Sequence, residues 1–594
     1  MGLPQLFRRT PKNDPATEVA VHTITEAEKD LATDAATATK ANDDPELSDR
    51  VDGDAQRGVQ NVEAVTMTWT KKSLYTAFFL IWLLYFVNAM QSSILNNLIP
   101  FVTSDFESHS LLAVIYIVAN AMTAAVYIPL AKILDLWGRA EGFAIMTLFA
   151  TLGMIIMATC HNLPVFCAAY VFYSVGFGGM TYCVDVITAD ASKLRNRALA
   201  YAFTSSPYMI TAFAGAKAAE EFYENVSWRW GFGCFAIIFP CVAAPLFILL
   251  KLNLRKAENA GLLAREPSGR TFLQSVWHYA IEFDALGVFL FGSGLTVFLL
   301  PFTLAESAPN GWKSGYIIAM IVVGFVVLVG FGLHEAFTAP KPFIKAQFLL
   351  DRTVVGACLL DATYQISYYC WALYFTSFLQ VVNDLSVAEA GYISNTFNVV
   401  SGVLLIITGF SIRHSGRYKW LLYGAVPLYI FALGLMIHFR NPNPNVGYIV
   451  MCQIFIAIGG SIFIICQQLA VLAAVDHQHV AAVLALLFVV GTTGGAIGNT
   501  LSGAIWTNTY KKGLLMYLPE SAMENIDMIY VDLPTQLSYA IGTPERLGIQ
   551  KAYGYAQTRM LAAGTGIMSL SFIWTLLIKN INVAEKKQTK GTVF

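Results

Sequence analysis

The sequence predicts an all-α membrane protein, and its composition, span lengths and loop charges all indicate this fold class. The chain has 594 residues, of which 56% are hydrophobic and 13% are charged, and its mean hydropathy is +0.55. Ordinary soluble domains carry roughly 25% charged residues. Windows of about 20 apolar residues recur along the chain, and each is long enough to cross a bilayer as a helix.

The first 72 residues are polar, rich in Ala, Thr, Asp and Glu, and nearly free of aromatic residues. Such a segment has too little apolar surface to fold alone, so 1–72 is predicted to be a disordered cytosolic tail. The first apolar run begins only near Leu74, which excludes a secretory signal peptide.

Fourteen apolar spans follow the tail. Their approximate bounds are 74–100, 111–132, 143–160, 165–189, 198–218, 230–250, 284–304, 315–334, 354–379, 389–411, 420–438, 447–469, 480–507 and 560–579. With the N-terminus inside, the short inner loops hold sixteen Lys and Arg residues, and the short outer loops hold only Arg229, Lys313 and Arg440. Cytoplasmic loops carry this excess of positive charge, so both termini are expected in the cytosol.

The spans are expected to form two six-helix bundles with two inserted helices between them. The predicted segments are an N-terminal bundle at 73–250, a linker at 251–283, inserted helices at 284–335, a C-terminal bundle at 354–579 and a cytosolic tail at 580–594. The linker has aromatic residues among polar ones, which predicts an amphipathic helix on the inner surface. The long outer loop at 508–559 is expected to form short helices over the outer mouth.

A short charged turn joins the second and third spans. Asp135 and Arg139 are four residues apart and could pair on one helical turn, and Gly138 lets the backbone reverse closely. The turn resembles the loop between helices 2 and 3 of the major facilitator superfamily, with Ala131 and Ala140 replacing a Gly and a basic residue. The resemblance implies the major facilitator fold and a gating role for Asp135, Gly138 and Arg139.

A weaker copy of this turn occupies Gly409–Lys419 and keeps Arg417. Two copies in two halves indicate an internal duplication, which is a common plan in transporters.

Span 4 ends in a second charged cluster on the inner side. A salt link from Asp190 to Arg139, Arg195 or Arg197 would hold the inner side shut.

One polar face of span 1 carries Tyr85, Asn88, Gln91 and Asn96 near helical spacing. Polar groups inside a span are costly in lipid, so they mark either a substrate pathway or hydrogen bonds between helices. The sequence leaves both interpretations open.

Tyr182 and Asp185 share a face of span 4, and Tyr182 is a candidate for substrate binding. Desolvation makes a buried carboxyl a candidate proton carrier, so Asp185 is a candidate for proton coupling. A structural salt link to a nearby arginine is the alternative for Asp185.

Span 9 has the richest polar face. Asp361, Tyr364, Gln365 and Tyr368 follow i, i+3, i+4 and i+7, and Tyr369 adds aromatic surface. One acid with several aromatic rings and an amide favours a ligand wall over aromatic packing, and Asp361 is a second candidate for proton coupling. Gln453 in span 12 is a weaker candidate for substrate binding.

Several kinds of chemistry are excluded because their motifs are missing. The sequence has no phosphate-binding loop, no nucleophile elbow and no zinc-protease motif, so it is not predicted to be an enzyme or an ATP-driven pump. The nine cysteines show no metal-ligand spacing, so no cofactor or bound metal is expected. A net charge of −1 suggests no nucleic-acid partner.

Five stretches narrow the resemblance to one branch. They are Ser92–Leu98, Ile133–Glu141, Ala189–Ala198, Ser227–Gly233 and Ile549–Ala556. These stretches resemble fungal siderophore–iron transporters of the fourteen-span branch. The resemblance implies proton-coupled import of an intact ferric siderophore, of hydroxamate type, through a cavity lined by the first and fourth helices of each bundle. The iron is then cargo inside the ligand, and lipid and protons are the other partners.

Two further functions stay open at this point. One is a proton-coupled exporter of drugs or metabolites from the related fourteen-span group, and the other is a nutrient receptor that signals through its tail. The plasma membrane is the expected location, with a vacuolar or endosomal membrane as the alternative.

Overall fold

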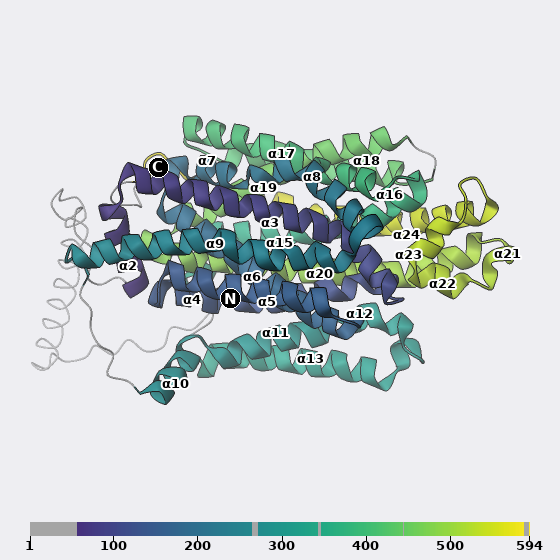
Figure 1. The fold of residues 1–594 in the computed structure, drawn as a ribbon, viewed down its shortest axis with the longest axis horizontal. Coiled ribbons are helices and arrows are strands. Elements are labelled where there is room, and N and C mark those ends of the chain that lie inside the picture. Colours follow the sequence, from purple (N-terminus) through teal and green to yellow (C-terminus); the bar gives the residue numbers. More distant parts are fainter. Residues whose placement is uncertain (1–55, 264–270, 342–345, 443–444, 587–592) are drawn as a thin grey trace, which may run out of the picture. The chain divides into compact units, whose positions relative to one another are not determined.

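The computed structural model describes residues 56–263, 271–341, 346–442, 445–586 and 593–594. Regular structure in these ranges is helical throughout (Figure 1). Twelve of the described helices are long and apolar enough to cross a membrane. The predicted all-α membrane fold class is confirmed. The expectation for residues 1–55 lies outside the described residues.

The N-terminal half contains the six predicted spans. Its elements are α3 (Lys71–Asp105), η1 (His109–Leu111), α4 (Leu112–Leu136), α5 (Arg139–Thr159), α6 (Leu163–Asp190), α7 (Leu194–Ser205), α8 (Pro207–Glu221), η2 (Phe222–Val226) and α9 (Trp228–Asn259). Helix starts follow local chemistry, because Thr70 caps α3 and Asn162 caps α6 through their side-chain oxygens. Within this half α5 packs against α6 and α9, and α3 packs against α8 and α9.

The C-terminal half repeats this arrangement. Its elements are α15 (Arg352–Ala372), α16 (Phe375–Asn383), α17 (Val387–Ser415), α18 (Lys419–Phe439), α19 (Val446–Ala474), η6 (His477–His479), α20 (Val480–Tyr517), α21 (Glu520–Met523), α22 (Ile526–Val531), α23 (Leu533–Ser538), α24 (Pro544–Met568) and α25 (Ser571–Leu577). Here α18 packs against α19 and α24, and α15 packs against α20 and α24. These are the contacts expected of a second copy of the same six-helix unit.

Two pairs of the expected spans join the halves. Helix α4 packs against α20, and α17 packs against α7 and α8. In each pair, the second span of one half meets the fifth span of the other. The space between the halves is therefore bordered by helices from both.

The predicted count of fourteen spans stays a prediction. Two expected spans are helical but are not among the twelve apolar helices. The fifth is divided into α7 and α8 at Ser206, where Pro207 begins a new helix. The ninth is α15, which carries the polar face, and it is followed by a break at Tyr374 with φ of 60°.

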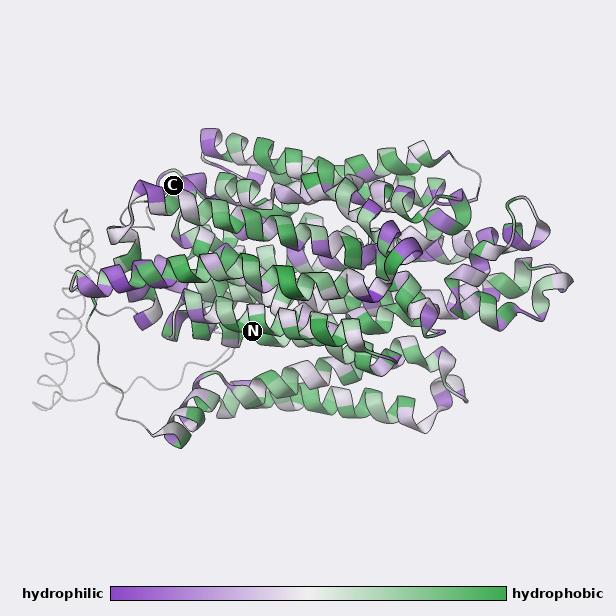
Figure 2. Cartoon of the chain, viewed as in Figure 1, coloured by the Kyte–Doolittle hydropathy of each residue, from purple (hydrophilic) through white to green (hydrophobic). Residues whose placement is uncertain are grey.

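The inserted segment forms a hairpin beside the N-terminal half (Figure 1). Its elements are α10 (Phe272–Glu282), α11 (Ala285–Leu299), α12 (Pro301–Leu304), η3 (Ala305–Ser307), η4 (Gly311–Lys313), α13 (Gly315–Leu333), η5 (His334–Thr338) and α14 (Ala346–Leu350). Helix α13 is apolar and mostly exposed, as a lipid-facing helix must be, and the ribbon of this helix is largely coloured as hydrophobic in Figure 2. The predicted linker helix is present as α10, and its Tyr279 ring lies edge-on to Trp137 of the charged turn.

The tail prediction is wrong for its last part, because Arg57–Thr68 form helix α2. Val59, Ala64 and Trp69 are buried, and the helix packs against α4 and α9. Gly58 lies so close to α4 that an added Cβ would be 2.3 Å from the Leu134 carbonyl oxygen. Composition averaged over 72 residues concealed this short apolar face, which is stabilised by burial against other helices rather than by its own sequence.

The predicted bounds of the outer loop are also wrong. Helix α20 continues to Tyr517 and α24 begins at Pro544, so the connection between them covers only 518–543. The expected short helices are present as α21, α22 and α23. The Leu533 N–H donates to Ser104 Oγ at 3.0 Å, which holds the connection against the end of α3.

Candidate functional site

A cavity of about 200 Å³ lies between the two halves. Its lining residues are Asn120, Thr123 and Tyr127 of α4, Ser174, Phe177 and Gly178 of α6, Gln365 and Tyr369 of α15, and Thr492 and Gly495 of α20. Pockets that hold drug-sized ligands usually measure roughly 300–1,000 Å³. A ligand of that size would therefore enter only after the helices move apart.

The cavity contains two residues that the sequence predicted, Gln365 and Tyr369. Sequence reasoning missed the α4 wall, although Asn120, Thr123 and Tyr127 follow i, i+3 and i+7 on one helix face. That spacing was a usable signal in an otherwise apolar span. The missed residues lie on the second span of the N-terminal bundle, whereas the cavity was expected to be lined by the first and fourth helices of each bundle.

Asp185 is a buried carboxyl on α6 that contacts both halves. Tyr85 of α3 donates its hydroxyl to Asp185 Oδ1 at 3.1 Å, and Gln468 of α19 donates Nε2 to Asp185 Oδ2 at 3.3 Å. The alternative of a salt link to arginine is not what the structure shows for this residue. Both donors are neutral, so the carboxyl is not tied to a fixed cation.

Asp361 is a half-buried carboxyl on α15 whose contacts lie within the C-terminal half. With the Gln467 amide turned so that its nitrogen faces the carboxylate, it donates to Asp361 Oδ1 at 3.1 Å. A Cβ at Gly491 of α20 would lie 2.0 Å from Asp361 Oδ2. The carboxylate therefore sits directly against a glycine backbone, and its position depends on that glycine.

The aromatic residues of α15 face in different directions. Tyr364 is buried within the C-terminal half, where its ring packs against Tyr429 and Phe463. Tyr368 packs edge-on against Trp371, while Tyr369 reaches the cavity. Tyr364 therefore serves packing, whereas Gln365 and Tyr369 line the cavity.

The predicted face of span 1 is only partly assembled. Tyr173 donates its hydroxyl to Gln91 Oε1 at 2.6 Å, and Tyr85 binds Asp185 as described above. Asn96 is exposed and lies apart from this group. The amide groups of Asn88 and Gln453 are buried, and the described residues offer them no hydrogen bond.

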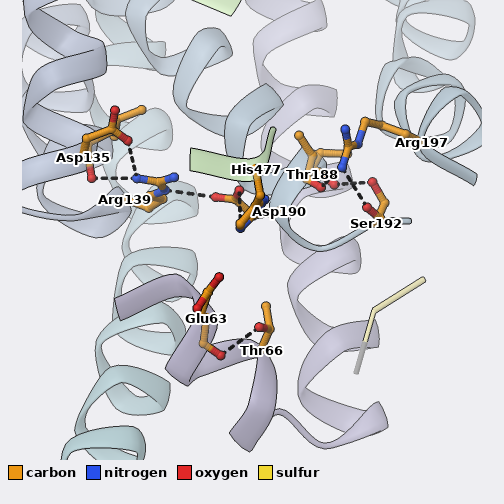
Figure 3. Close-up of polar contacts among 11 residues, drawn as sticks. Glu63, Thr66, Asp135, Arg139, Thr188, Asp190, Ser192, Arg197 and His477 are labelled. Carbon is orange, nitrogen blue, oxygen red and sulfur yellow. Dashed lines mark hydrogen bonds and ion pairs between the residues drawn. The ribbon is translucent and has the colours of Figure 1, made fainter. Parts of the chain in front are cut away.

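The inner ends of the helices hold a charged network, shown in Figure 3. We use inner and outer in the sense of the predicted orientation. Arg139 lies between two carboxylates and binds Asp190 and Asp135 at 3.0 Å each. Gly138, with φ of 126°, precedes α5 and allows this turn. The predicted link between Asp190 and Arg139 is therefore present, and it is buried.

Other predicted gating residues have different partners. Arg197 donates Nη2 to the carbonyl oxygens of Ala189 and Ser192, which fixes the turn after α6. Arg195 donates Nε to the Arg413 carbonyl at 3.2 Å and so joins the two halves. The Arg417 side chain is exposed, and the hydrogen bonds at this residue run through its backbone.

Further contacts join the halves at the inner side. Tyr182 donates its hydroxyl to the Ala481 carbonyl at 2.7 Å, so this predicted binding residue reaches α20. His477 Nε2 lies 4.0 Å from Asp190 Oδ1 (Figure 3). Sequence reasoning did not identify His477, because its neighbour in space is nearly 300 residues away in the chain.

Contacts also join the halves at the outer side. Tyr374 stacks on Trp506 with ring centroids 4.1 Å apart and donates its hydroxyl to the Ser110 carbonyl at 2.8 Å. Glu220 accepts a hydrogen bond from the Ala388 N–H at 3.2 Å, so the outer end of α8 contacts α17. Burial raises the pKa of Tyr530 in the outer connection to about 12.

Within the described residues, no group of three or more His, Cys, Asp and Glu side chains is placed to hold a metal ion. The nine cysteines are unpaired. The polar residues around the cavity are amides, hydroxyls and phenols, which donate and accept hydrogen bonds.

Comparison with known proteins gives close relatives over nearly the whole chain. The chain is 58% identical to the siderophore iron transporter mirB of Emericella nidulans, over 99% of both chains. It is 57% identical to MFS siderochrome iron transporter 1 of Gibberella zeae, over 93% of this chain and 90% of the relative. The family model of the Major Facilitator Superfamily matches residues 81–360. The chain belongs to the siderophore iron transporters of this superfamily.

Solved structures of other superfamily members share the fold. A peptide transporter POT in complex with sulfate matches with a TM-score of 0.53 at 14% identity, over 88% of this chain and 99% of that chain. The human organic anion transporter MFSD10 (TETRAN) matches with a TM-score of 0.52 at 12% identity, over 84% and 99%. At these identities the likeness concerns the fold alone.

Proposed function

We propose that this protein is a secondary transporter that imports intact ferric siderophores by proton symport and alternating access. The observation that carries the proposal is the 58% identity, over 99% of both chains, to a siderophore iron transporter. The cavity between the halves supports it, because helices from both halves contribute to its wall. A site built in this way opens to either side when the halves rock about it.

The substrate class fits the chemistry of the cavity wall. A ferric siderophore presents its iron already wrapped in ligand oxygens, so a binding site needs hydrogen-bond donors and aromatic surface rather than metal ligands. Gln365, Tyr369, Asn120 and Tyr127 supply these groups. We propose the hydroxamate type, with Asn88, Gln91, Tyr368 and Gln453 completing the site as the halves separate.

Alternating access requires that one set of end contacts breaks while the other holds. The inner set contains Tyr182 with Ala481, and the outer set contains Tyr374 with Ser110. Each contact is a single hydrogen bond between halves, worth only about 0.5–1.5 kcal/mol net. Bonds of this strength break readily, which suits surfaces that separate in every cycle.

Asp185 and Asp361 are the proposed proton carriers. Both carboxyls are inside the protein and accept hydrogen bonds from neutral side chains. A carboxyl with neutral partners can take up and release a proton without breaking an ion pair. The proposed location is the plasma membrane with both termini in the cytosol.

The test is uptake of iron-labelled siderophores by a fungal strain that lacks its own importers. Expression of this protein should restore uptake of at least one hydroxamate siderophore, and an uncoupler should abolish it. The empty vector and the Asp361→Asn variant are the controls. No uptake across a broad siderophore panel, combined with lowered cellular drug content, would favour the exporter instead.

A further inference from the structure

Two adjacent glutamines on α19 contact Asp185 and Asp361, the two acids that we propose as proton carriers. Gln468 donates Nε2 to Asp185 Oδ2 at 3.3 Å, and Gln467 donates to Asp361 Oδ1 at 3.1 Å. Asp185 belongs to α6 in the N-terminal half, and Asp361 belongs to α15 in the C-terminal half. Neighbouring residues on an α-helix point about 100° apart, so one turn of α19 can serve both carboxyls.

The two contacts respond differently to movement of the halves. Gln467 and Asp361 lie in the same half, so a rigid-body rotation leaves their hydrogen bond intact. Gln468 and Asp185 lie in different halves, so separation of the inner ends must break theirs. Asp185 is five residues before the inner end of α6, or about 7.5 Å along the helix, so inward opening acts directly on it.

An amide is suited to a group that changes its protonation. The Gln468 nitrogen donates to a carboxylate, and after a turn of the amide its oxygen accepts from a carboxylic acid. Lysine or arginine would bind only the ionised form. The titratable groups that face Asp185 among the described residues are tyrosines, namely Tyr85, Tyr127, Tyr201 and Tyr208. Tyrosine is neutral at working pH, so these groups do not compete for the proton.

We propose that Gln468 is a positioning residue that couples the proton on Asp185 to inward opening. While the inner ends are together, the amide holds the carboxyl in either protonation state and excludes water from it. When the inner ends separate, the hydrogen bond is lost and Asp185 releases its proton to cytosolic water. The inference rests on the proposed proton symport, and it assigns to Gln468 a role that the proposed site does not include.

The experiment replaces Gln468 with Met, which keeps the length of the side chain and removes its hydrogen bonds. The expected maximal rate of siderophore uptake falls about tenfold, the order expected for losing one hydrogen bond to a charged group. The KM should change less than about twofold, because Gln468 is outside the cavity wall. Loss of the donor favours the protonated carboxyl, so the pH profile should move toward higher pH by about one unit.

A double-mutant cycle shows whether Gln468 acts through Asp185. In an Asp185→Asn background, Gln468→Met should lower uptake by less than about twofold. Gln468→Glu should recover activity at low pH, because a protonated Glu again donates and accepts. Gln557→Met on α24 is the control for the cost of placing Met inside the protein, because the Gln557 side chain is fully buried, and surface expression is measured for all variants.

The outcomes separate this inference from the proposed function. If uptake by the wild type depends on neither pH nor uncoupler, the symport proposal itself is wrong. If wild-type uptake depends on pH but the pH profile of a well-expressed Gln468→Met variant is unchanged, only the role of Gln468 is overturned. An equal loss of uptake in the wild-type and Asp185→Asn backgrounds also overturns it.

Discussion

Gly491→Ala would move Asp361 without changing the acid itself. The added methyl carbon would lie 2.0 Å from Asp361 Oδ2, whereas ordinary contact begins at 3.4 Å. The carboxylate must therefore withdraw by about 1.4 Å, the difference between these separations. A shift of that size breaks a hydrogen bond of 3.1 Å to Gln467. Misplacement of a reacting group by about 1 Å can cost a hundredfold, so we expect at least a tenfold loss of uptake.

Stability should change much less than transport in this variant. The clash involves the end of a side chain, so the cost of overpacking should be near the low end of about 1–3 kcal/mol. Gly434→Ala is the matched control, since it is also a helical glycine but has no atom within 4 Å of an added Cβ. Its uptake should equal that of the wild type.

The assay is initial uptake of labelled ferric siderophore, normalised to surface expression, with thermal stability measured in detergent. Wild-type uptake by a well-expressed Gly491→Ala protein would refute the reasoning, because it would mean that the position of Asp361 does not matter. A loss of expression in Gly491→Ala with normal expression in Gly434→Ala would indicate instead that the site cannot absorb the methyl group.

Three further predictions concern other parts of the protein. Asp361→Asn should lower uptake at least about tenfold with normal surface expression, and unchanged uptake would remove this residue from the site. Arg139→Lys keeps the charge but loses the planar guanidinium that binds two carboxylates. Uptake by cells and the thermal stability of the purified protein should therefore both fall. A chain lacking residues 1–55 should keep its uptake, whereas one lacking residues 1–69 should lose thermal stability because α2 is removed. If the protein were instead a receptor that signals through its tail, the deletion of residues 1–55 would abolish signalling.

Local properties of the chain were sufficient to predict the membrane helices. The length needed to cross a bilayer and the charge of the flanking loops are carried by contiguous residues, so runs such as 447–469 identify a helix without tertiary information. A salt link from Asp190 to a nearby arginine was also predictable, because charged residues at the inner ends of neighbouring spans have few other partners, but the sequence left Arg139, Arg195 and Arg197 open and the structure selects Arg139. The bounds of the outer loop could not be predicted, because α20 and α24 continue past the apolar runs and are stabilised there by packing against each other.

The sequence by itself predicted that Asp185 and Asp361 are acids inside membrane spans, because an ionisable residue within an apolar run needs no structure to be noticed. Only the tertiary structure decided what each acid contacts. Gln468 is 283 residues from Asp185, and no local pattern links them. The same holds for α2, whose burial depends on the inner ends of α4 and α9. Helix formation follows from neighbours in the chain, whereas the environment of a side chain follows from neighbours in space.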